Sequence, residues 1–168
     1  GGLISKWLGF ASIMAFVSGS LVVGLLSDRR FARRLRTLLL SLIGMGIAGV
    51  GVFALALPSP LSPTGFVQNG LLHFCSVAVL SAAMGGVFPV AIELAAELVY
   101  PAEESTVVGA ITSINTVSGM VYLMFMDRIP NTDVNLPFLS ALVFALLLVY
   151  LAEERYVRRD ADVGVGVR

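Results

Sequence analysis

The chain has 168 residues, of which 57% are hydrophobic and 13% are charged, and its formal net charge at pH 7 is zero. A soluble domain is about 45–50% apolar and about 25% charged, so this composition excludes an ordinary globular core. The apolar residues form blocks of about 20 residues, the length that a membrane-spanning helix needs. Because lipid leaves exposed backbone without hydrogen-bond partners, we expect an all-α integral membrane protein.

Five membrane-spanning helices are predicted in chain order, over residues 7–26, 38–57, 72–98, 107–126 and 138–152. In the first, Ser20 and Gly24 are one turn apart, a spacing of small residues that lets another helix approach closely. In the second, four glycines between residues 44 and 51 predict tight helix packing. In the third, Gly85–Gly86 and Pro89 predict a kink or a tilted helix.

Basic residues are distributed unevenly along the chain. Of eleven lysines and arginines, five lie between Arg29 and Arg36 and four lie in the polar tail, residues 153–168. Since connections between spanning helices alternate sides, these two segments share one side of the membrane with the turn after the third helix. The positive-inside rule makes that side cytoplasmic, so we expect a cytoplasmic C-terminus. An odd number of helices, in a chain that begins with Gly1, is expected if a preceding helix has been removed.

Charged residues at the cytoplasmic ends of the first and third helices form a candidate gate. Its members are Asp28, Arg29 and Arg33 after the first helix, and Glu93, Glu97, Glu103 and Glu104 around the end of the third. Glu93 and Glu97 are one turn apart and share a helix face. If these helices are neighbours, the arginines can pair with Glu97 or Glu103 in a latch that breaks when the cytoplasmic side opens. Alternatively, the arginines follow topology alone and the glutamates reach into lipid headgroups.

A polar stripe runs along the fourth predicted helix. Thr112, Asn115, Thr116 and Gly119 have the spacing of one helix face. A polar face is costly in lipid unless it meets a cavity or another helix. The stripe therefore either lines a path for a solute or makes hydrogen bonds to another helix. The sequence contains no phosphate-binding loop, metal-ligand spacing, catalytic constellation or nucleic-acid patch, so we predict no enzyme activity, metal, cofactor or nucleic-acid partner.

Two stretches resemble known transporters. GLLSDRRFARR, residues 24–34, is similar to the second-half loop motif of the major facilitator superfamily. PVAIELAAELVYPAEEST, residues 89–106, resembles the feline leukaemia virus subgroup C receptor family of solute carriers. The family signature E-x-x-x-E-x-x-Y-P-x-x-E is matched by Glu93, Glu97, Tyr100, Pro101 and Glu104.

This resemblance implies that the five helices are helices eight to twelve of a twelve-helix transporter that works by alternating access. It implies a small organic solute of the choline, ethanolamine or haem class, and two partners, the lipid bilayer and the missing N-terminal transporter half. Two differences argue against choline: Thr116 stands where we expect a glutamine in the choline carriers, and Val107–Val108 replace a small polar pair. The alternative is a truncated, non-transporting membrane paralogue that acts as a receptor or scaffold.

Overall fold

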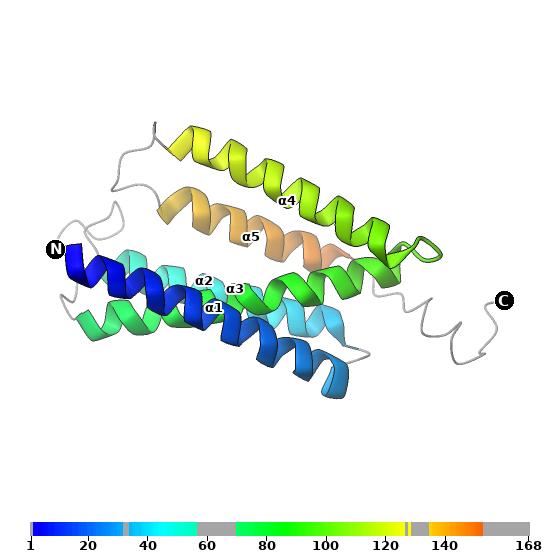
Figure 1. Ribbon diagram of the computed structural model, residues 1–168, viewed down its shortest axis with the longest axis horizontal. Coiled ribbons are helices and arrows are strands. Elements are labelled where there is room, and N and C mark those ends of the chain that lie inside the picture. The colour runs from blue at the N-terminus through cyan, green and yellow to red at the C-terminus, as the bar shows by residue number, and fades with distance from the viewer. Residues whose placement is uncertain (1, 32–33, 57–69, 127, 129–134, 153–168) are drawn as a thin grey trace.

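The computed structural model describes residues 2–31, 34–56, 70–126, 128 and 135–152. Of residues 2–5, 28–30 and 126 it describes the backbone alone. The described chain folds into five helices, shown in Figure 1: α1 (Gly2–Arg30), α2 (Leu35–Ala56), α3 (Gly70–Leu98), α4 (Glu104–Met126) and α5 (Asn135–Leu151). Each overlaps one predicted helix, and the all-α expectation is confirmed for the part of the chain that the structure describes. The predicted tail, residues 153–168, lies outside it.

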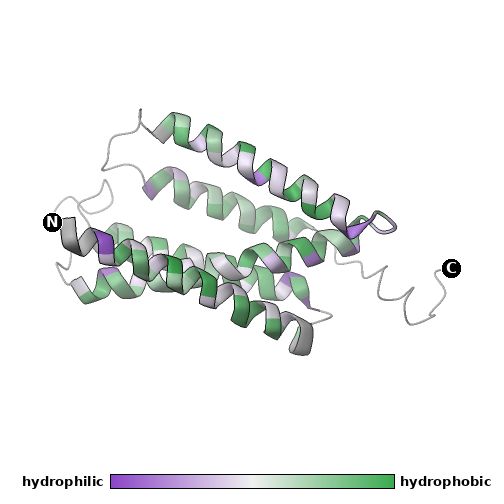
Figure 2. Ribbon diagram, in the orientation of Figure 1, coloured by the Kyte–Doolittle hydropathy of each residue, from purple (hydrophilic) through white to green (hydrophobic). Residues whose placement is uncertain are grey.

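Four of the helices are long and apolar enough to cross a membrane: Lys6–Ser27, Leu35–Leu55, Gly70–Leu98 and Glu104–Phe125. The fifth, α5, is equally apolar but has 17 residues, the lower limit of the range of about 17–25 that spanning helices cover. Hydrophobic residues run the length of the helices, and hydrophilic residues gather mainly near their ends (Figure 2). The protein is therefore an integral membrane protein with several apolar helices.

Successive helices run in opposite directions (Figure 1). As a result, the end of α1, the start of α2, the turn between α3 and α4, and the end of α5 all lie at one end of the bundle. We call this the charged end, because most of the charged residues in the described part of the chain lie there. Of the segments predicted to share one side of the membrane, the residues around the α1–α2 connection and the turn after α3 therefore lie at the same end, and the tail lies outside the described residues.

The helix α3 is central, packing against α1, α2 and α4, and α2 also packs against α5. Glycines make the α1–α3 contact close. A Cβ added to Gly19 would lie 2.6 Å from the Cα of Ala82, and one added to Gly85 would overlap the backbone carbonyl of Phe16. Such close backbone approach is how helices associate in lipid, where burial of apolar surface gives no driving force.

Gly24, one of the two small residues predicted to let another helix approach, is not the glycine of α1 that meets α3. A Cβ at Gly24 would meet nothing within 4 Å, whereas Gly19, next to Ser20, lies against α3. The reason is the rotation of α1 about its axis. Phe16, Gly19 and Val23 share the face that meets α3, and Gly24 lies beside that face.

Two of the four clustered glycines of α2 serve the contact with α3. A Cβ at Gly46 would lie 2.5 Å from Cε of Met84, and one at Gly49 would lie 3.1 Å from Cβ of Leu80. At Gly44 and Gly51 it would meet nothing within 4 Å. Nearer the charged end, α2 and α3 bury a leucine-rich cluster of Leu35, Leu38, Leu39, Leu42, Ile43, Val90 and Leu94. The helix α3 continues unbroken through Pro89 from Gly70 to Leu98.

Candidate functional site at the charged end

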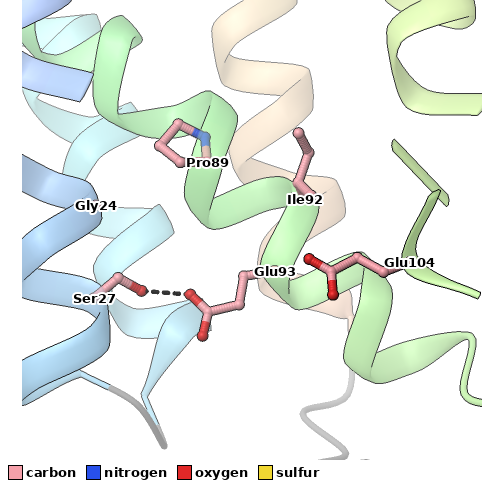
Figure 3. Close-up of a pocket in the computed structure, with 6 residues that line it drawn as sticks. All are labelled: Gly24, Ser27, Pro89, Ile92, Glu93 and Glu104. Atoms are coloured by element: carbon pink, nitrogen blue, oxygen red, sulfur yellow. Dashed lines mark hydrogen bonds between the residues drawn. The ribbon is translucent and has the colours of Figure 1, made fainter. Parts of the chain in front are cut away.

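A pocket of about 350 Å³ opens at the charged end of the bundle, between α1, α3 and the start of α4 (Figure 3). It is lined by Gly24, Ser27, Pro89, Ile92, Glu93 and Glu104. Glu93 extends from α3 toward Ser27, whereas Glu104 extends from α4 toward α3. The pocket therefore combines two carboxylates and a hydroxyl with an apolar wall, and it contains two of the predicted gate residues.

Ser27 joins α1 to α3 within this pocket. Its Oγ donates a hydrogen bond to Oε2 of Glu93 over 2.7 Å, and the serine is only 2% exposed. The close contact between α1 and α3 at Gly86 determines which residues of the two helices face each other here. Val23 packs on Gly86, and Ser27 and Glu93 follow one and two turns later along the same faces. Sequence reasoning missed Ser27, because a serine in a membrane helix ordinarily bonds its own backbone.

The Ser27–Glu93 bond is testable by a double-mutant cycle. We expect Ser27→Ala to destabilise the fold by about 1–3 kcal/mol, because it leaves a part-buried carboxylate without that donor. Combining it with Glu93→Gln should cost less than the two single changes together, with a coupling of about 1 kcal/mol. Thermal unfolding in detergent measures all four proteins. The control is Ser113→Ala, whose hydroxyl bonds the carbonyl of Gly109 in its own helix; strict additivity would contradict the pairing.

Among the predicted gate residues whose side chains the structure describes, Glu97 is the most buried, with 3% of its surface exposed. It lies one turn beyond Glu93 and on the same α3 stripe as Val90 and Leu94, which belong to the leucine-rich cluster with α2. A side chain so enclosed does not reach lipid headgroups, which contradicts that alternative for Glu97. Burying a carboxylate costs free energy unless it is hydrogen-bonded or paired. We therefore expect the Glu97 side chain to interact with other protein groups rather than with lipid.

Glu103 and Glu104 form the start of α4. The backbone carbonyl of Glu103 accepts hydrogen bonds from the N–H groups of Thr106, at 3.0 Å, and Val107, at 3.2 Å, so Glu103 is the N-cap residue. Glu104 follows in the first turn, where the positive end of the helix dipole favours an anion. Both side chains are exposed. Both glutamates therefore lie where they help to start α4, whether or not they also take part in a gate.

The structure does not describe the side chains of the predicted gate residues at the end of α1 and just after it. Asp28 and Arg29 are in the last turn of α1 by their backbone, and Arg33 lies outside the described residues. The latch therefore stays a prediction. Its geometric condition is met, because α1 and α3 pack side by side and Ser27, one residue before Asp28, touches Glu93.

The polar stripe of α4 is exposed along its length. Thr116 Oγ1 donates to the carbonyl of Thr112, 2.9 Å away, so this hydroxyl is satisfied within its own helix. The Asn115 amide makes no hydrogen bond to any described residue. No other described helix covers Thr112, Asn115 or Thr116, which leaves the stripe open to a solute path or to a helix outside the described chain.

Antiparallel apolar helices, packed through glycines and carrying their carboxylates at one end, define a multi-pass helical membrane protein. Over 159 residues, 92% of the chain, the sequence is 26% identical to an uncharacterized MFS-type transporter of Caenorhabditis elegans. The chain spans 25% of the length of that relative. No protein-family model and no solved structure matches the chain. The similarity supports a place in the major facilitator superfamily and a transporter-like role, without distinguishing among families inside the superfamily.

Proposed function

We propose that this chain is the C-terminal portion, helices eight to twelve, of a major facilitator transporter that moves a small organic solute by alternating access. The observation that carries the proposal is the similarity to an MFS-type transporter along 92% of the chain. The alternating helix directions and the gathering of charge at one end support it. The proposed role is transport without an enzymatic step.

In this proposal the solute belongs to the choline, ethanolamine or haem class, as the resemblance to the feline leukaemia virus subgroup C receptor family implies. Three signature carboxylates support the assignment by their positions. Glu93 and Glu104 line one pocket, and Glu97 is buried one turn further along α3. The stripe of Thr112, Asn115 and Thr116 lines the solute path, where the Asn115 amide offers both a donor and an acceptor.

The charged end is the cytoplasmic end in this proposal, since Arg29 and Arg30 in the last turn of α1, Arg34, and Arg36 at the start of α2 lie there. The C-terminus is then cytoplasmic. The pocket lined by Ser27, Glu93 and Glu104 belongs to the cytoplasmic gate, and an N-terminal half together with helix seven completes the solute path between two six-helix units.

The test is uptake of labelled choline and ethanolamine into proteoliposomes. We expect flux from the protein that includes an N-terminal half and none from the 168 residues alone. In the longer protein, Asn115→Leu should lower flux by about tenfold or more, because it removes the hydrogen-bonding group of the path. The matched control is Ile114→Leu, a neighbouring position of α4 that is 67% exposed. A folded longer protein that moves neither choline nor ethanolamine would reject these two solutes, and a failure to move haem as well would favour the receptor or scaffold.

A further inference from the structure

Arg36, in the first turn of α2, reaches the last turn of α5. Its Nε donates to the backbone carbonyl of Val149 over 3.1 Å, and its Nη2 donates to the carbonyl of Tyr150. The guanidinium also lies over the Tyr150 ring, 5.5 Å from its centroid. The start of α2 and the end of α5 both lie at the charged end, more than a hundred residues apart in sequence (Figure 1).

The carbonyls of Val149 and Tyr150 lie in the last turn of α5, where no further turn of this helix supplies N–H donors. The last four carbonyls of a helix have no intrahelical partner, and the last helical bond described here runs from the N–H of Ala152 to Leu148. Val149 and Tyr150 come next in the series. A cation at this end also suits the negative pole of the helix, and α5 has no basic residue in its own last turn.

We propose that Arg36 is an interhelical clasp that caps α5 from α2, so that the two helices move as one body at the charged end. A planar guanidinium suits this task, because it can donate to two carbonyls at once while stacking on an aromatic ring. Side-chain packing of Leu146 and Val149 against the leucine-rich cluster continues the same contact deeper in the bundle. The clasp does not depend on the proposed transport function.

The test is amide hydrogen exchange of the protein in lipid nanodiscs, read on the peptide that covers Leu146–Ala152. We expect Arg36→Gln to speed exchange there by about tenfold, since two charge-assisted hydrogen bonds to the last turn are lost. Arg36→Lys should give a smaller increase, because an ammonium cannot reproduce the fork. Tyr150→Leu should have the smallest effect of the three, because it removes the ring and leaves both carbonyl acceptors in place.

The control is Arg34→Gln, which removes the same charge from an exposed side chain two residues earlier. The clasp is supported if Arg36→Gln acts on the last turn of α5 and leaves the α1–α3 contact around Gly19 unchanged. It is overturned if exchange at Leu146–Ala152 stays at the wild-type rate, or if Arg34→Gln raises it equally. If Arg36→Gln speeds amide exchange throughout the protein, the Arg36→Lys variant is used instead. A wild-type exchange rate at Leu146–Ala152 in Arg36→Lys then overturns the clasp.

Discussion

Replacing Gly85 with valine is expected to separate α1 from α3 and to prevent recovery of folded, monodisperse protein. Even a single Cβ at this position would overlap the backbone carbonyl of Phe16. A backbone carbonyl cannot rotate away as a side chain can, so the whole of α1 must shift. Overpacking of a well-packed contact costs typically about 1–3 kcal/mol, and a branched side chain pressed against backbone belongs at or above the upper end. Size-exclusion chromatography and thermal unfolding in detergent measure the loss.

The matched control for this substitution is Gly51→Val in α2. It makes the same chemical change in a membrane helix, but a Cβ there would meet nothing within 4 Å. A second variant, Gly19→Ala, should destabilise the same contact from the other helix, because its Cβ would lie 2.6 Å from the Cα of Ala82. Equal stability of Gly85→Val and Gly51→Val would show that the close approach of α1 and α3 does not hold the fold together.

Reversing the charge of Glu97 is expected to have the largest effect on transport in the longer protein. Glu97 is 3% exposed, so Glu97→Lys places a cation in the protein interior in place of a carboxylate. Removing one partner of a buried ion pair costs about 3–5 kcal/mol, because the remaining charge is left without compensation. If Arg29 or Arg33 is the partner, combining Glu97→Lys with reversal of that arginine to glutamate should restore part of the flux.

Glu103 provides the comparison for the latch. It is exposed, and its backbone carbonyl rather than its side chain starts α4. We therefore expect Glu103→Lys to change flux only slightly, since exposed ion pairs contribute about 0–1 kcal/mol. The uptake assay should be paired with a measurement of the amount of folded protein in the membrane. The latch is rejected if every double reversal transports as poorly as its worse single variant.

The sequence was enough to predict those features that depend on a single segment of the chain, such as its hydrophobicity, its length and its charge. The existence and order of the five helices follow from blocks of apolar residues, because a chain in lipid must satisfy its backbone bonds locally. The gathering of charge at one end follows from the alternation of helix directions. Glu93 and Glu97 were found because a carboxylate at the edge of a long apolar run is costly and needs a reason.

Only the tertiary structure decided which side chains meet. The close approach falls at Gly19 rather than Gly24, Glu93 meets Ser27, and Arg36 caps α5 across the bundle. Each of these contacts depends on how a helix is rotated about its axis and how far it is shifted along its neighbour. The order of apolar and polar residues determines that a helix crosses the membrane, but rotation and shift are set jointly by two packed surfaces, so one helix read alone does not contain them.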